Sequence, residues 1–115
     1  MAQHVFISFS RAIEGEAEAY EEWYDRQHMP DVLAVPGFVS GQRFRVVQRR
    51  PEETTRDYHY MIVYQLETDD VEASIAEMRA RIGSGVIDTG GLFDPSMLGF
   101  YTGTEAAPKQ FAKKD

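Results

Sequence analysis

The alternation of apolar and polar residues predicts four strands and two helices. Short stretches rich in β-branched and aromatic residues, with a period of two, predict strands at 4–9, 38–48, 58–67 and 98–102. Apolar positions three or four residues apart predict helices at 14–29 and about 71–82. We expect Pro30 to end the first helix, because proline has no amide hydrogen to donate. Asp69 and Glu72, three residues apart, predict a capping box at the start of the second helix.

The order βαββαβ predicts an α+β, ferredoxin-like fold, in which a four-stranded antiparallel sheet carries both helices on one face. Residues 1–107 are expected to form this single domain, and residues 108–115 to form a polar C-terminal tail. The predicted strands bear large apolar residues on both sides, so a lone chain would expose a broad apolar surface. We therefore expect a homodimer in which two sheets pack face to face.

Composition excludes several classes of function. The chain has 115 residues, with 19 acidic and 12 basic side chains and a net charge of −7, which disfavours nucleic acid and anionic membranes as partners. The absence of cysteine excludes disulfides, a thiolate nucleophile and cysteine metal sites, and fits the cytoplasm. No stretch reaches the roughly 18 apolar residues of a membrane helix, and no signal peptide is recognisable. We expect a soluble cytoplasmic protein whose partners are neutral small molecules or protein chains.

The strongest candidate for chemistry is His28, near the predicted end of the first helix. Imidazole is the side chain that both donates and accepts a proton near neutral pH. Tyr24 lies one turn earlier on the same helix face and is a candidate ligand contact, whereas Trp23 points about 100° away and is expected in the core. Two structural alternatives remain open, because His28 could instead cap the last carbonyl groups of the helix or bond to Asp31.

Topology predicts which other side chains join His28. The first helix runs antiparallel to the first strand, so its C-terminal end should lie over His4, at the start of that strand. The ends of the third and fourth strands should reach the same end of the sheet. We therefore predict one pocket between helix and sheet, with His28 and His4 as catalytic residues and with Phe6, Tyr24, Tyr64, Gln65 and Tyr101 as substrate-binding residues. His59 is expected at the opposite end, so we expect no metal site, and we expect no cofactor.

Three stretches around His28 form a recognisable motif: Glu22-Trp23-Tyr24-Asp25, His28-Met29-Pro30-Asp31 and Val35-Pro36-Gly37-Phe38. This motif resembles the signature of EthD-like proteins in the dimeric α/β-barrel superfamily. The resemblance implies a ferredoxin-like chain that forms a dimeric α/β barrel. It does not select a reaction, since the superfamily includes cofactor-free monooxygenases, polyketide cyclases, isomerases, dehydratases and haem-degrading enzymes. His4 stands where cyclases of the plant and stress-responsive branch use a histidine, but the second-helix histidine segment of that branch is absent here.

These observations lead to competing hypotheses of function. The first is a cofactor-free enzyme that acts on a hydrophobic, aromatic or polyketide-like small molecule. In it His28 is the general acid or base of a lyase, dehydratase or isomerase reaction, and His4 or Gln65 polarises a carbonyl or phenol oxygen. A cofactor-free monooxygenase on the same fold is an alternative. A second alternative is a non-catalytic dimeric binding or accessory protein of a catabolic pathway, in which His28 is structural. A haem-handling protein is the third class, and it fits the acidic surface poorly.

Overall fold

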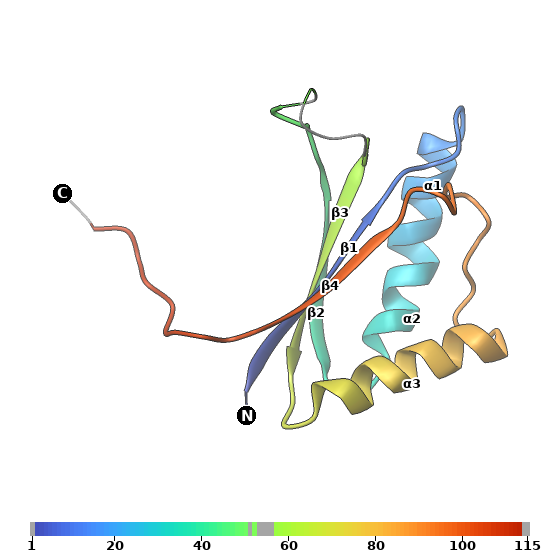
Figure 1. Ribbon diagram of the computed structural model, residues 1–115. Coiled ribbons are helices and arrows are strands. Elements are labelled where there is room, and N and C mark those ends of the chain that lie inside the picture. The colour runs from blue at the N-terminus through green and yellow to red at the C-terminus, as the bar shows by residue number, and fades with distance from the viewer. Residues whose placement is uncertain (1, 51, 53–56, 114–115) are drawn as a thin grey trace.

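The computed structural model describes residues 2–50, 52 and 57–113, which form one sheet and one layer of helices (Figure 1). Part of the expected loop at 49–56 lies outside the described residues. In chain order the elements are β1 (Gln3–Ser10), α1 (Ala17–Trp23), the π-helix η1 (Tyr24–His28), α2 (Met29–Leu33), β2 (Phe38–Arg45), β3 (Tyr60–Glu67), α3 (Val71–Ser84) and β4 (Gly99–Thr104).

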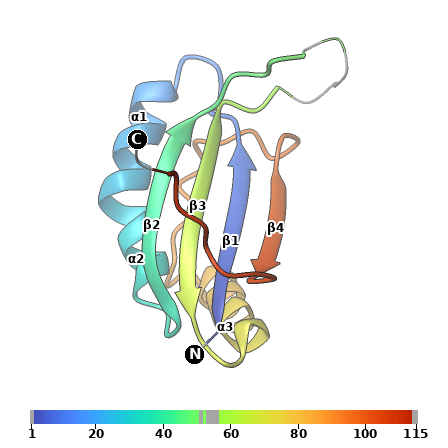
Figure 2. The same ribbon diagram turned by 90° about the vertical axis from the view of Figure 1, so that its left-hand side faces the viewer.

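The sheet confirms the predicted ferredoxin-like fold. Its strand order is β2-β3-β1-β4, and each neighbouring pair is antiparallel. All helices cover one face of the sheet, and the chain after β4 extends away from the opposite face (Figure 1). In the view onto that second face, strands lie in front of the helices, and only the C-terminal segment passes over them (Figure 2). We call this second face the open face.

The core lies between the sheet and the helices. Alternate residues of β3 are buried, and their partners in β1 are buried as well, so that each strand turns one side toward the helices. The side chains exposed by less than 2% are Tyr20, Tyr64, Ile62, Leu66, Ile87, Val32 and Val35. The two tyrosines in this set place polar hydroxyl groups inside an otherwise apolar core, and each hydroxyl has a hydrogen-bond partner.

The first helical stretch is longer than predicted, because it does not end at Pro30. The segments α1, η1 and α2 follow one another without a break from Ala17 to Leu33. The amide of Met29 donates to the carbonyl of Tyr24, five residues back, which is the bonding of a π-turn. Pro30 then lies in the first turn of α2, where the missing amide hydrogen costs little. His28 is therefore inside a helical run and does not cap its end.

The second predicted helix, α3, agrees with its predicted range to within two residues, but its N-cap is not the predicted one. Its N-cap is Asp70, whose side chain accepts a hydrogen bond from the amide of Ala73 at 3.1 Å. The N-cap therefore lies one residue after the predicted Asp69, and no capping box forms with it, because Ala73 has no side chain to accept a hydrogen bond in return. The helix ends at Gly85, which adopts a φ of 84°, a left-handed conformation that favours glycine.

Candidate functional site

A cavity of about 200 Å³ lies between the helix layer and the β1–β4 side of the sheet. Strand β1, the α1–η1 helix, α3, the loop that follows α3, and β4 all contribute to its wall. The lining residues are Ser8, Phe9, Ser10, Tyr20, Trp23, Tyr24, His28, Ile82, Thr89, Phe93, Leu98 and Phe100. Aromatic and aliphatic groups dominate this lining, and a few polar groups converge on it, which is typical of a small-molecule site.

His28 contributes the basic group of the cavity wall. Its Nδ1 lies 3.0 Å from the carbonyl oxygen of Asp88. A carbonyl oxygen only accepts, so Nδ1 carries the hydrogen, and in the neutral ring Nε2 holds a lone pair. Among the described residues, Nε2 has no hydrogen-bond partner. The His28 ring is flanked by Trp23 and Tyr24, with ring centroids 4.7 and 4.8 Å away.

Burial decides the charge of His28. Desolvation lowers its pKa below the usual 6.5, although the Asp88 carbonyl and the charges of Asp31 and Asp88 act in the opposite direction. The ring is therefore neutral at pH 7. A neutral imidazole with a free Nε2 can accept a proton from a bound molecule, which is the role of a general base.

The loop after α3 holds His28 in this orientation. The Asp88 side chain accepts hydrogen bonds from the Gln27 amide group at 3.2 Å and from the backbone amide of Gly90 at 2.9 Å. Gly90 has a φ of 72°, and a Cβ there would overlap the Trp23 indole. The indole nitrogen of Trp23 is the one buried side-chain polar atom without a hydrogen-bond partner in the described part of the chain. Close packing therefore presses the loop against the cavity wall but leaves this donor unused.

Two tyrosines of the helix bring their hydroxyl groups to the sheet. The Tyr20 hydroxyl lies 2.5 Å from the Ser10 hydroxyl, and the Tyr24 hydroxyl lies 2.7 Å from that of Tyr64. Desolvation raises the pKa of Tyr20, Tyr24 and Tyr64, so all three phenols are neutral at physiological pH. Phe6 stacks on Tyr64, with centroids 6.1 Å apart, and completes a layer directly behind the cavity.

The structure brings together only part of the predicted pocket. His28 and Tyr24 line the cavity. Tyr64 and Phe6 lie behind it, since Tyr64 bonds to Tyr24 and Phe6 stacks on Phe100 of the cavity wall at 6.0 Å. His4, Gln65 and Tyr101 lie elsewhere, which corrects the expectation that all seven residues share one pocket.

His4 is a buried, fully bonded residue at the far end of β1. Its Nδ1 lies 3.0 Å from the Thr104 hydroxyl and its Nε2 lies 3.1 Å from the carbonyl oxygen of Thr68. Because that carbonyl must accept, Nε2 carries the hydrogen and neither ring nitrogen is free. The separation from His28 follows from the length of the helix, since His28 lies five residues before its end at Leu33, more than one turn. A wider hollow of about 450 Å³ lies beside His4 and Gln65.

Tyr101 and Gln65 face away from the helices. Tyr101 pairs with Ile7 across β1 and β4, and its ring contacts Phe9 at 6.2 Å on the open face. Its side chain is 65% exposed. Gln65 pairs with Val5 and therefore lies on the same side of the sheet as Val5. Alternation along β3 already puts Gln65 on the face opposite to Tyr64, and the pairing with Ile7 of β1 puts Tyr101 on the open face.

Several lining residues were missed by the sequence analysis. Trp23 packs against the core, as expected, but it also lines the cavity, which was not expected. Ser8 and Ser10 had no predicted role, although their alternation with Phe6 along β1 places them on the helix side of the sheet. Thr89 and Phe93 come from an irregular loop that no periodic pattern in the sequence could have assigned, and Leu98, expected at the start of the last strand, lies directly before β4.

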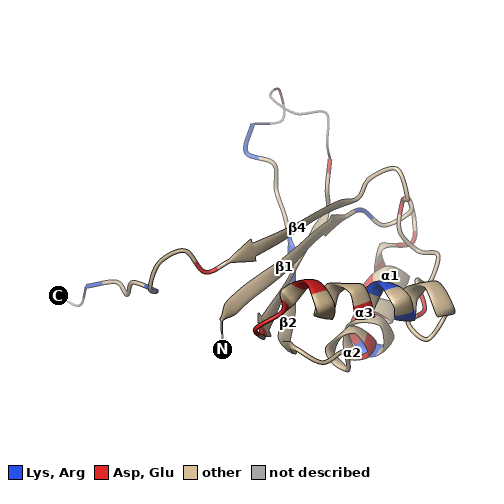
Figure 3. Cartoon of the chain, turned by 60° about the horizontal axis from the view of Figure 1, so that its bottom comes forward, with Lys and Arg blue, Asp and Glu red and all other residues tan. Residues whose placement is uncertain are grey.

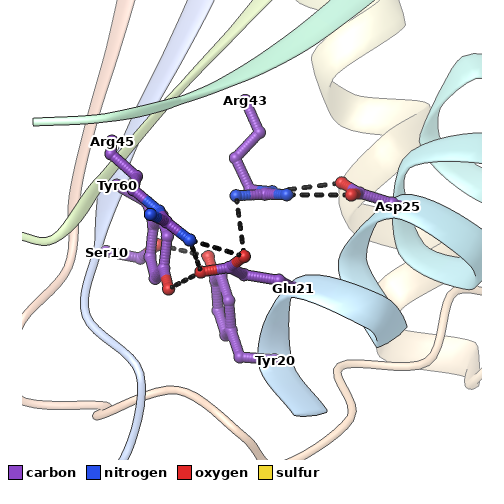
Figure 4. A network of polar contacts seen from close by, with 7 residues as sticks. All are labelled: Ser10, Tyr20, Glu21, Asp25, Arg43, Arg45 and Tyr60. Carbon is purple, nitrogen blue, oxygen red and sulfur yellow. Dashed lines mark hydrogen bonds and ion pairs between the residues drawn. The ribbon is translucent and has the colours of Figure 1, made fainter. Parts of the chain in front are cut away.

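A charged cluster occupies the other flank of the same helix (Figure 4). The Glu21 carboxylate accepts hydrogen bonds from the Tyr60 hydroxyl at 2.7 Å and from Arg45 at 3.1 Å. Arg43 lies 3.9 Å from Glu21 and donates two hydrogen bonds to Asp25, at 2.8 and 3.1 Å. The Tyr60 hydroxyl and the two arginines lower the pKa of Glu21, while burial and Glu21 raise the pKa of Tyr60 to about 12. Every charge here has a partner, which identifies a structural cluster.

Metal and membrane sites are not seen in the described residues. No group of three or more histidine, aspartate or glutamate side chains in that part of the chain is placed to hold a metal ion. No helix there is both long enough and apolar enough to span a membrane.

Comparison with solved structures places the fold among known proteins. No family model matches the sequence, and no curated protein matches it. An EthD family protein from Bacillus halodurans superposes with a TM-score of 0.57 at 18% identity, covering 91% of this chain and 99% of that one. A putative monooxygenase from Shewanella loihica superposes with a TM-score of 0.55 at 18% identity, covering 96% of this chain and 99% of that one. The heme-degrader MhuD from Mycobacterium tuberculosis, with two hemes bound, gives 0.62 at 16% identity, covering 93% and 99%.

The chain shares their fold. At these identities the likeness supports the EthD-like resemblance at the level of architecture and does not transfer a reaction. The three proteins differ in what their descriptions assign to them, from a family name to heme degradation. Function must therefore be argued from the cavity of this chain.

Proposed function

We propose that the cavity binds a hydrophobic, single-ring aromatic molecule and that His28 transfers a proton to and from it. The observation that carries this proposal is the state of His28. Its Nδ1 is committed to the Asp88 carbonyl, its Nε2 is free, and burial keeps the ring neutral. A neutral base in an apolar cavity is well suited to proton transfer on carbon or oxygen.

The size of the cavity limits the ligand. An apolar cavity of about 150 Å³ holds one benzene molecule. The cavity at His28, of about 200 Å³, thus has room for one ring with a short substituent. A porphyrin of four pyrrole rings exceeds this volume, so the ligand class proposed here differs from that of the heme-bound neighbour.

The available groups favour proton transfer over nucleophilic catalysis. The chain has no cysteine, and among the described residues no hydroxyl group of the cavity is hydrogen-bonded to a histidine. Reactions of the isomerase, dehydratase or lyase type require one group that removes a proton and returns it. His28 supplies that group without a cofactor. Oxygenation of an activated substrate on the same fold begins with the same deprotonation.

Hydrogen exchange tests this proposal even while the substrate is unidentified. We would incubate a panel of single-ring phenols and ketones with the protein in deuterium oxide and follow their carbon-bound hydrogens by NMR. Enzyme-dependent exchange that disappears in His28→Gln and persists in His59→Gln supports the proposal. Binding of the panel without exchange by the native chain would favour a non-catalytic binding protein instead.

We further propose that the protein is a homodimer in which two open faces pack together. Strands β1 and β4 carry no charged residue, and charges are concentrated on the helices (Figure 3). Phe44 and Tyr101 on the open face are 38% and 65% exposed, an arrangement that favours burial against a second copy. Sedimentation equilibrium should give twice the chain mass, and Tyr101→Lys should shift the protein toward monomer. A native monomer at micromolar concentration would contradict the dimer.

A further inference from the structure

Two serines occupy helix-facing positions of β1 where an apolar side chain would ordinarily complete the core. Ser8 and Ser10 follow Phe6 with the period of two, and their exposed fractions are 8% and 5%. Both line the cavity that contains His28. Burial of a hydroxyl group is unfavourable unless it is hydrogen-bonded. The hydrogen bonds made around these two serines therefore indicate what a ligand could still bond to.

Ser10 is bonded to a tyrosine of the helix. The Ser10 and Tyr20 hydroxyl groups lie 2.5 Å apart, and both line the cavity. Two hydroxyl groups contain two hydrogens, and one contact between them uses only one. The pair therefore keeps one hydrogen that it can donate to a ligand in the cavity.

Ser8 meets the cavity beside a second pair of hydroxyl groups. Tyr24 lies in the cavity wall, and its hydroxyl lies 2.7 Å from that of Tyr64 behind it. This pair again has two hydrogens and one contact between them, so one hydrogen is not used within the pair. Ser8 and Ser10, spaced two residues apart on one strand, thus bring two hydroxyl groups to the same cavity.

We propose that Ser8 and Ser10 form a binding site for the carbonyl oxygen of the ligand, which makes the substrate a single-ring aromatic carbonyl compound. This inference rests on the proposed role of His28 and names the substrate class of that site. His28 Nε2 takes a proton from the carbon next to the carbonyl group, and the electron pair of that C–H bond forms the enolate. The negative charge moves to the oxygen, where the two serine hydroxyls donate to it. Return of the proton to the same carbon exchanges its hydrogen, and return to a different carbon of a conjugated enolate completes an isomerisation; neither step needs an oxidant or a reductant.

The arrangement reassigns a role that the sequence analysis gave to His4 or Gln65. Polarisation of an oxygen requires a donor in the same cavity as the base, and neither of those residues lies there. The serines do, and Ser10 is bonded to Tyr20 of the helical run that also carries His28. The donors and the base are therefore positioned by the same pair of elements.

A matched pair of ligands tests the proposal. Acetophenone and isopropylbenzene have the same branched skeleton of non-hydrogen atoms, but only acetophenone has an acceptor oxygen. Trp23 is the single tryptophan of the chain, so its indole N–H gives one NMR signal from the cavity wall. Titration of the native protein with each compound yields two dissociation constants, and their ratio measures recognition of the oxygen independently of protein stability.

We expect the native protein to bind acetophenone roughly fivefold more tightly than isopropylbenzene, the preference that one net hydrogen bond confers. Ser10→Ala and Ser8→Ala should each reduce this preference, and the double variant should abolish it. Ser40→Ala, on the exposed part of β2, is the control and should change nothing.

Each alternative result is decisive. Equal affinity of the native protein for the two ligands, or an unchanged preference in the double serine variant, would overturn the carbonyl site while the proposed role of His28 stands. Failure of both ligands to shift the Trp23 signal would overturn the aromatic ligand class, and with it both proposals. Loss of hydrogen exchange in His28→Gln with an intact acetophenone preference would separate the base from the oxygen site and support both.

Discussion

The two flanks of the first helical run use polar side chains in opposite ways. Toward β2, the carboxylates of Glu21 and Asp25 bind the guanidinium groups of β2, so that each charge is neutralised by a partner (Figure 4). Toward β4, the groups are neutral, and the Nε2 of His28 and the indole nitrogen of Trp23 have no partner among the described residues. One flank satisfies its polar groups completely, and the other leaves some unsatisfied.

This difference separates stability from function within one helix. Paired charges fix the helix against the sheet, and they gain nothing from a ligand. Unpaired groups in an apolar cavity are costly in the free protein and gain hydrogen bonds when a ligand arrives. Variants on the two flanks should therefore affect different measurements, and the following predictions run from the largest effect to the smallest.

Loss of the imidazole should give the largest effect on activity. Removal of a positioned general base commonly reduces the rate by about 100-fold to 10,000-fold, so we expect His28→Gln to reduce exchange by this factor. The melting temperature should change little, because glutamine can still donate to the Asp88 carbonyl. If His28→Gln still catalysed hydrogen exchange of the ligand at the native rate, His28 would not be the base, and the two flanks would not differ in function.

Packing of the loop against Trp23 should control the stability of the cavity side. Gly90→Ala places a methyl group against the indole and forces alanine into a left-handed backbone conformation. We expect the free energy of unfolding to fall by about 2–4 kcal/mol. Gly91 is the matched control, since its φ is 67° but no atom lies within 4 Å of an added Cβ. Gly91→Ala should cost only about 1 kcal/mol. Equal losses in urea denaturation would mean that the loop does not pack on Trp23.

The charged flank should affect stability alone. Glu21→Gln weakens the contacts with Tyr60, Arg43 and Arg45, and we expect a loss of about 1–2 kcal/mol with unchanged exchange activity. The side chain is 23% exposed, so solvent screening keeps the effect moderate. Glu22→Gln removes only the exposed helical pair with Arg26 and should cost less than about 0.5 kcal/mol. Lower activity in Glu21→Gln at full stability would assign this cluster a catalytic role.

The two flanks should also respond to pH in different ranges. Burial lowers the pKa of His28, so the unfolded chain binds its proton more readily, and this contribution to stability is lost as pH falls from 6.5. The pKa of Glu21 is lowered below 4.5, so its contribution is present above that pH and is lost as pH falls through its folded value. The free energy of unfolding, measured by denaturation at a series of pH values, should depend less on pH below 6.5 in His28→Gln. In Glu21→Gln it should depend less on pH below 4.5. A His28 contribution lost on raising the pH would indicate a structural cation.

The fold could be predicted because its determinants are local. Period-two alternation located β1 and β3, and helical spacing located α3, each within two residues. The order of those elements then left few topologies. The face of the sheet on which a strand residue lies is harder to predict. The face that Tyr101 takes depends on the pairing of β4 with β1 and not on the sequence of β4 alone.

The candidate site could be predicted only around His28 and Tyr24, which lie in one helical motif. Proline usually ends a helix, and the sequence does not reveal that a π-turn places Pro30 in a new first turn. The error displaced His28 toward the start of β1 and made His4 its expected neighbour. Ser8 and Ser10 carry no chemical signal alone, since their role depends on tyrosines one layer away and on a loop about 80 residues later in the chain.

The π-turn has a further consequence for the angular phase of the helix. Each residue of an α-helix advances by about 100°, so an uninterrupted helix would place Val32 about 120° around the axis from Tyr20. The wider turn absorbs one extra residue and reduces that angle to about 20°, in line with Tyr24 at about 40°. Tyr20, Tyr24 and Val32 are indeed all buried. A one-residue deletion within 24–28 would therefore rotate the α2 side chains by about 100° relative to those of α1.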